Sequence, residues 1–165
     1  MRSAGFTLIE LLIVIAIIAL LSLVGFVNFK DFAANQVIVK AAGEVQTLLR
    51  LAQSNATTST LCNNQGATSW SLKFSNAQTI ELRCNPSDYL YKTYTIANAQ
   101  LSIKCDTTNL LLPATFTYSV GVGTLAISPD CLQSINFTIS KPSGSSSNAV
   151  PQSFTISKGG AINVQ

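Results

Sequence analysis

The chain of 165 residues contains no histidine, and this absence restricts its chemistry. Histidine is the commonest general base and metal ligand near neutral pH. Other signals of catalysis are also missing, because no Cys-x-x-Cys pair occurs and the glycine-containing segment 121–123 is too short for a phosphate-binding loop. Serines and lysines leave a Ser–Lys hydrolase open, but no motif points to one. We therefore expect no enzyme, no metal site and no cofactor.

Charge is also scarce, since only 10% of the residues are charged and the net charge is +3. Beyond residue 60, the basic residues are Lys73, Arg83, Lys92, Lys104, Lys141 and Lys158, and the acidic residues are Glu81, Asp88, Asp106 and Asp130. This excess is too small and too scattered for an electrostatic nucleic-acid surface. A surface of Ser, Thr, Asn and Gln instead suits an extracellular protein that packs against copies of itself with little charge repulsion.

The most informative feature that is present is an apolar run near the N-terminus. Residues Leu11 to Phe29 include no charged side chain, and a helix needs roughly 20 such residues to cross the hydrocarbon of a bilayer. Glu10 nevertheless lies inside the apolar block. A carboxylate in lipid costs on the order of 2.5–3.5 kcal/mol even on the lower insertion scales, so such a residue is usually functional and needs a partner.

Three ordinary explanations of this run fit less well. A secretory signal peptide has several positive charges before its apolar region, whereas only Arg2 precedes this one. An uncleaved anchor gives no reason for Glu10, and a lipoprotein anchor needs a cysteine soon after the run, whereas the first cysteine is Cys62. Arg2 and the free N-terminus predict that the leading residues stay in the cytoplasm, so that everything after Phe29 faces outside.

The segment that begins with a glycine, an aromatic residue and a glutamate resembles the class III signal of type IV prepilins and type II secretion pseudopilins. The matching residues are Gly5, Phe6, Thr7, Leu8, Ile9, Glu10 and Leu11. In that family a membrane peptidase, the prepilin peptidase, cuts after the glycine and N-methylates the new terminal residue. The resemblance therefore implies cleavage between Gly5 and Phe6, with Phe6 as the methylated terminus.

Glu10 gains a partner under this interpretation. Cleavage exposes an ammonium group on Phe6, and Glu10 lies four residues on, one helical turn away on the same face. In a single subunit the amine can satisfy its own carboxylate. In a fibre, the carboxylate of an incoming subunit can instead meet the terminal amine of the subunit ahead. We expect this pairing to set the axial register, because fixing register is a well-attested use of buried polar contacts.

A second pattern follows the apolar run, with apolar residues at spacings of three or four, as on one face of an amphipathic helix. They are Val37, Ala41, Val45, Leu48, Ala52 and Ala56, flanked by Ile38 and Leu49, while Lys40, Glu44 and Arg50 lie off the stripe. Together the two patterns predict one helix from Phe6 to about Asn55, roughly 75 Å long at 1.5 Å per residue. Many pilins have a proline near the position of Val27, and this chain has none there, so any local melting is expected near Gly25.

From Ala56 onward, apolar and polar residues alternate, which is typical of strands with one buried face. The expected strands lie at 70–74, 80–84, 101–105, 116–120, 125–127, 135–139, 154–156 and 162–164. Short strands with tight turns predict mostly antiparallel sheet, whose buried face the helical stripe can cover. The predicted fold class is α+β, a long N-terminal helix packed on an antiparallel β head, as in the pilin fold that the resemblance implies. We divide the chain into a leader (1–5), a transmembrane or fibre-core half-helix (6–29), an amphipathic half-helix (30–58) and an extracytoplasmic head (59–165).

The four cysteines all fall in the predicted head, and they are Cys62, Cys84, Cys105 and Cys131. An even number in an oxidising compartment favours two disulfides, and the spacings and the lack of histidine disfavour a zinc site. Among the three possible pairings we favour Cys62–Cys84 and Cys105–Cys131, because neighbours in sequence close the smallest loops. Four buried free thiols are the alternative.

Two segments of the head leave alternatives open. The stretch 141–150 reads as a mobile, exposed linker between two strands. Aromatic residues near a lysine could contact a ligand at a fibre tip, as bases stack on aromatic rings, or could simply occupy strand positions. These residues are Trp70, Tyr89, Tyr91, Lys92 and Tyr94.

In finer detail, residues 46–62 and the closing hairpin 154–164 resemble H-type minor pseudopilins, whose heads have two antiparallel sheets. The resemblances together imply a minor structural subunit of a type IV pilus or type II secretion pseudopilus, with a major pilin or a tip module for DNA uptake, adhesion or secreted substrates as alternatives. The implied partners are prepilin peptidase, other pilin or pseudopilin subunits, the inner-membrane assembly platform, membrane lipid before assembly and, for the tip alternative, nucleic acid. The implied location is the bacterial inner membrane as a single-pass protein with its head outside, and then the fibre.

Overall fold

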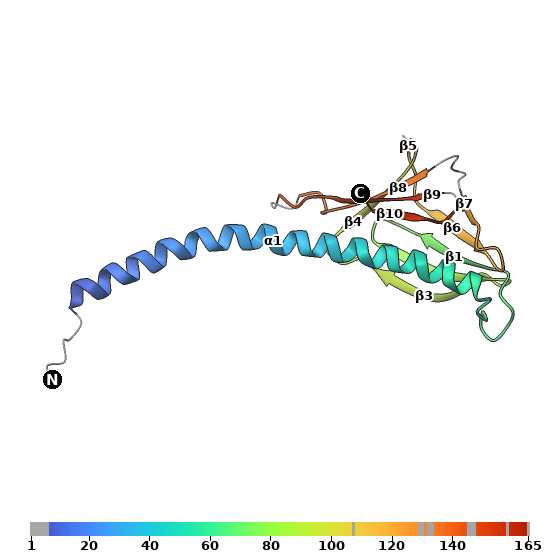
Figure 1. Cartoon of the computed structure of the whole chain (residues 1–165), viewed down its shortest axis with the longest axis horizontal. Helices are drawn as coiled ribbons and strands as arrows, with labels where there is room; N and C mark the ends of the chain where they lie inside the picture. The colour runs from blue at the N-terminus through green and yellow to red at the C-terminus, as the bar shows by residue number, and fades with distance from the viewer. Residues whose placement is uncertain are drawn as a thin grey trace.

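A long helix and two β-sheets make up the described part of the computed structural model (Figure 1). The structure describes residues 7–106, 108–128, 131, 134–144, 148–157 and 159–164, and the side chains of residues 23–28 and 164 are outside this description. The elements are α1 (Leu8–Thr57), β1 (Ser69–Phe74), β2 (Thr79–Asn85), β3 (Tyr89–Thr95), β4 (Gln100–Cys105), β5 (Thr108–Asn109), β6 (Ala114–Ser119), β7 (Leu125–Ser128), β8 (Ser134–Ser140), β9 (Gln152–Ser157) and β10 (Ile162–Val164). The predicted α+β fold, a helix packed on an antiparallel head, is confirmed.

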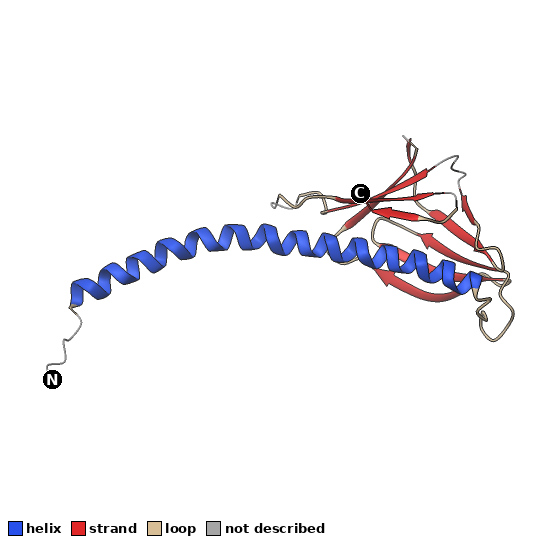
Figure 2. Ribbon diagram, in the orientation of Figure 1, coloured by secondary structure: helices blue, strands red, loops and turns tan. Residues whose placement is uncertain are grey.

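Helix α1 is unbroken over 50 residues, through both Gly25 and Gly43. Figure 2 shows that it curves gently without a sharp kink, as expected for a helix that contains no proline to remove a backbone hydrogen bond. It ends at Thr57, two residues beyond the predicted end, and the Thr58 N–H still donates to the Ser54 carbonyl at 2.9 Å. The expectation of one continuous helix is therefore correct for the described residues.

The C-terminal half of α1 buries one face against the head. The buried residues of this face are Ala34, Ile38, Ala41, Ala42, Val45, Leu48, Leu49, Ala52 and Ala56. Val37, which the spacing placed at the start of the stripe, is only half-buried, whereas its neighbour Ile38 is fully buried. The buried face is therefore centred closer to Ile38 than predicted, and it starts a turn earlier, at Ala34.

The two sheets and the helix share one core. The first sheet has the strand order β3-β2-β1-β6-β7 and the second has the order β10-β9-β8-β4-β5, with every pair antiparallel. Phenylalanines from both sheets meet in the centre, where the Phe137 ring stacks on Phe154 at 4.9 Å and lies 5.7 Å from Phe74 and 5.5 Å from Phe116. All four rings are fully buried, so they join the two sheets into one unit.

Two disulfides tie the irregular segments to this core. Cys62, in the loop after α1, is bonded to Cys84 of β2, and Cys105 at the end of β4 is bonded to Cys131 before β8. This is the pairing that the sequence favoured. The linked residues are 22 and 26 positions apart, and closing loops of this size in the unfolded chain is expected to stabilise the head by about 3 kcal/mol per bond.

The segment between β8 and β9 is exposed or half-exposed where it is described, as predicted, but it also makes contacts with α1. Its C-terminal end contacts α1, where the backbone N–H of Asn148 donates to the Asp31 carboxylate at 3.3 Å and that of Val150 donates to the Asn35 side chain at 2.8 Å. Ala149 packs against the core. These contacts extend the attachment of the head to the point where α1 leaves it. Residues 145–147 lie outside the described part.

Candidate assembly site on the N-terminal helix

The N-terminal half of α1 projects away from both sheets (Figure 2). Every described side chain from residue 7 to residue 22 is exposed. The large apolar residues among them are Leu8, Ile9, Leu11, Leu12, Ile13, Val14, Ile15, Ile17, Ile18, Leu20 and Leu21. They surround the helix on all sides, which is the pattern of a helix that is covered by apolar material in its working state.

Glu10 is the acidic residue of the first turn of α1. A carboxylate is favourable there because the first turn leaves backbone N–H groups unpaired at the positive end of the helix dipole. The Thr7 hydroxyl lies 3.5 Å from a Glu10 carboxylate oxygen, which is at the limit of a hydrogen bond. Gly5 and Phe6 lie outside the described residues, so cleavage, methylation and the pairing of the Phe6 amine with Glu10 stay predictions.

Within the described residues, no helix is long and apolar enough to cross a membrane. The same part of the chain holds no group of three or more His, Cys, Asp or Glu side chains that could bind a metal ion. The described part of the N-terminal half-helix offers an apolar surface with the carboxylate of Glu10 near its tip.

The aromatic residues considered as a ligand surface differ in exposure, because Tyr89 is 41% and Tyr91 is 53% exposed while Trp70 is buried. Trp70 is fully buried, and its indole N–H donates to the Thr60 carbonyl at 3.3 Å, so the expectation that it could contact a ligand is wrong. β1 lies between β2 and β6, and this central position buries the inward-facing Trp70. The Tyr91 ring packs edge-on against Trp70 at 5.2 Å, and the Lys92 ammonium lies 5.0 Å from the Tyr94 ring centre. Residues Tyr89–Thr95 form strand β3, which agrees with the alternative that these tyrosines occupy strand positions.

A charged network fixes the turn between β2 and β3. Arg83 Nε donates to Glu81 at 2.8 Å, Arg83 Nη1 donates to Asp88 at 2.6 Å, and the Ser75 hydroxyl donates to Glu81 at 2.8 Å. The hydrogen bonds from Arg83 and then Ser75 lower the pKa of Glu81, and the Glu81 carboxylate raises the pKa of Arg83. The network links β2 to the turns on either side of it, so we assign it to stability.

Glu81→Gln should remove a pH-dependent part of the stability of the head. Because folding lowers the pKa of Glu81, its contribution is fully present above the ordinary value of 4.5 and is lost as the pH falls through the lowered value. The Glu81 side chain is 19% exposed, so we expect a difference of about 1 kcal/mol or less at pH 7. Urea unfolding of wild type and variant at pH 7 and pH 2 tests this, and a difference that is unchanged at pH 2 would contradict it.

Comparison with known proteins agrees with the N-terminal site. Residues 1–26 match a family model described as the prokaryotic N-terminal methylation motif. This segment contains Gly5, Phe6 and Glu10, the residues that carry the resemblance. The match supports the resemblance of this segment to the N-terminal motif of type IV pilins and pseudopilins. No curated protein and no solved structure matches the chain, and the resemblance of the head to H-type minor pseudopilins receives no support.

Proposed function

We propose that the chain is a structural subunit of a type IV pilus or type II secretion pseudopilus and that it polymerises through α1. One observation carries this proposal. The described N-terminal part of α1, which lies within the segment that matches the methylation motif, is apolar and exposed on all sides, while the C-terminal half is anchored to a compact head. Such a helix must be covered by lipid or by the helices of other subunits. A fibre subunit satisfies this requirement at both stages, because lipid covers its helix before assembly and other subunits cover it in the fibre.

Before assembly, residues 6–29 are inserted in the inner membrane and the head is extracytoplasmic. This part of the proposal rests on the sequence, because the uncharged run from Leu11 to Phe29 includes residues 23–28, whose side chains are outside the described structure. Arg2 keeps the leader in the cytoplasm. The two disulfides of the head are consistent with an oxidising compartment.

In the fibre, Glu10 pairs with the methylated amine of Phe6 of a neighbouring subunit. The carboxylate lies at the free tip of α1, and its contact with Thr7 is a long one, so it is accessible to an incoming group. In apolar surroundings both charges are costly alone, which makes their pairing specific for one register. The inner-membrane assembly platform would deliver the subunit. The minor-subunit assignment stays a prediction, and the buried Trp70 weakens the tip-binding alternative.

Gly5→Leu should block processing by at least tenfold, because a peptidase subsite that accepts glycine before the cut leaves no room for a branched side chain. The measurement is the intact mass of the protein from the membrane fraction, in which the variant keeps residues 1–5. Ser3→Leu is the matched control, with the same bulk two residues upstream, and it should be processed normally. Efficient cleavage of Gly5→Leu would count against the proposed site.

A further inference from the structure

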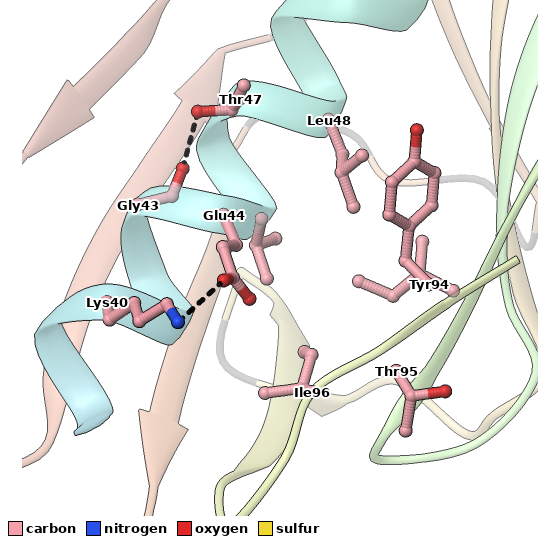
Figure 3. A pocket seen from close by; sticks show the side chains of 10 residues that line it. Lys40, Gly43, Glu44, Thr47, Leu48, Tyr94, Thr95 and Ile96 are labelled. Atoms are coloured by element: carbon pink, nitrogen blue, oxygen red, sulfur yellow. Dashed lines mark hydrogen bonds and ion pairs between the residues drawn. The ribbon is translucent and has the colours of Figure 1, made fainter.

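A groove of about 610 Å³ opens between α1 and the end of β3 (Figure 3). Gly43 and Leu48 of α1 form one wall, and Tyr94, Thr95 and Ile96 form the other. Figure 3 shows the apolar side chains of Leu48 and Ile96 on opposite sides of the opening, with the Lys40–Glu44 ion pair beside it on the helix. A smaller hollow of about 330 Å³ continues the groove along α1 toward Val37. The groove is therefore a mainly apolar slot on the outside of the head, with a more polar extension toward Val37.

The same helix carries an apolar patch that a single subunit leaves uncovered. The four phenylalanines of the described head, Phe74, Phe116, Phe137 and Phe154, are fully buried. By contrast, Phe29 is 67% exposed and Phe32 is 60% exposed. They are three residues apart and so lie on the same side of α1. A chain that buries its other described phenylalanines leaves these two available for a contact with another molecule.

We propose that the groove of one subunit receives Phe29 and Phe32 of a second copy of this chain in the fibre. This inference rests on the proposed function. The patch lies on the same helix as the exposed apolar residues between 8 and 22, so a neighbour that packs along that helix brings Phe29 and Phe32 with it. The groove can receive this patch because it is mainly apolar and large enough for ring side chains. It borders the same helix, C-terminal to the patch.

The geometry makes this contact one that repeats along a fibre. At about 100° per residue, Phe29 and Phe32 point roughly 110° away from the side of α1 that carries Glu44 and Leu48. Phe32 and Glu44 are twelve residues apart, about 18 Å along the axis. The patch and the groove are therefore different surfaces at different heights. A contact of this kind is not closed by a two-fold axis, and its repetition gives a helical filament. It also implies that copies of this chain are neighbours in the fibre.

The test is a disulfide cross-link between two full-length chains that are co-expressed in the host. One chain carries Phe32→Cys and the other, with a C-terminal tag, carries Thr95→Cys. Both replaced side chains are exposed, so neither change opens a cavity in the core. After oxidation of sheared fibres, we expect the amount of tagged heterodimer to be at least ten times the amount that the control pair forms. The control pair is Phe32→Cys and Ser102→Cys, in which the second cysteine lies on β4 of the second sheet.

The outcomes separate the two proposals. If wild-type chain is recovered in fibres but the heterodimer does not exceed the control, or a homodimer of two Phe32→Cys chains dominates, the groove contact is wrong and the fibre-subunit proposal stands. If wild-type chain never enters fibres, both are wrong. If the cysteine variants do not assemble, Thr95→Trp replaces them: filling the groove should lower incorporation at least tenfold, while Ser102→Trp should not. Normal incorporation of Thr95→Trp would overturn the contact and leave lipid or a small apolar ligand as the occupant.

Discussion

Replacing Glu10 with alanine is expected to lower incorporation into fibres about a hundredfold while cleavage after Gly5 proceeds normally. The variant leaves the terminal ammonium of Phe6 without a counter-charge in an apolar contact between helices. Removing one partner of a buried ion pair costs about 3–5 kcal/mol, which corresponds to a factor of a hundred or more. The peptidase site lies before Glu10, so the leader should still be removed.

The measurement compares the chain in sheared fibres with the chain in membranes by quantitative immunoblotting, and an intact mass checks the processing. Ser22→Ala is a matched control on the same exposed half-helix. The Ser22 hydroxyl donates to the Ile18 carbonyl of its own helix at 2.8 Å, so its loss changes neither charge nor exposed apolar surface substantially. Normal incorporation of Glu10→Ala, or an equal loss in Ser22→Ala, would contradict the pairing.

Phe137→Ala is expected to lower the free energy of unfolding of the head by about 3–5 kcal/mol. Phe137 is fully buried on β8 and contacts the rings of Phe154, Phe116 and Phe74 from both sheets. Its removal leaves a cavity where the two sheets meet, and the surrounding strands cannot collapse into that space without losing their register. The effect is therefore larger than the transfer free energy of the side chain alone.

The natural reporter for this measurement is Trp70, since the chain has one tryptophan and its side chain is buried in the head. Its fluorescence follows unfolding of the head in the detergent-solubilised full chain and is insensitive to melting of the N-terminal half-helix. Phe32→Ala removes the same side chain from an exposed position on α1 and should leave the unfolding midpoint unchanged. An unchanged midpoint for Phe137→Ala would show that the two sheets do not share this core.

The sequence predicted those features of the fold that depend on local periodicity. The spacing of three and four from Ala41 to Ala56 reflects one helical face, and the alternation around Phe137 reflects a strand with one buried side. Both patterns persist because burial acts on every residue of the element. β5 was missed because Thr108 and Asn109 are too few to show a period. The disulfide pairing was favoured correctly because each bond joins segments that are close in sequence.

Features that depend on contacts between distant segments could not be predicted. Trp70 is buried because β1 is central in its sheet, and alternation does not reveal the order of strands. The contact of Asn148 with Asp31 spans 117 residues, and nothing in the composition of the linker indicates it. The groove between α1 and β3 arises in the same way, from the distance at which the edge strand passes the helix.

The candidate site shows the same division. Glu10 was recognisable because the methylation motif is contiguous in sequence. Its partner was not visible in the structure, since the proposed amine belongs to Phe6 after cleavage and, in the fibre, to another subunit. The exposed apolar residues from Leu8 to Leu21 identify the surface that the proposed assembly would cover, but the order of subunits along it would be a property of the fibre.

The most direct test of the fibre-subunit account is the N-terminus of the mature protein, read from the mass of its N-terminal fragment after extraction from the cell envelope. We expect a chain that starts at Phe6 and carries an added methyl group on its amine. A chain that still starts at Met1, or one that starts beyond the uncharged segment, would contradict the account, because neither has a free amine one helical turn from Glu10.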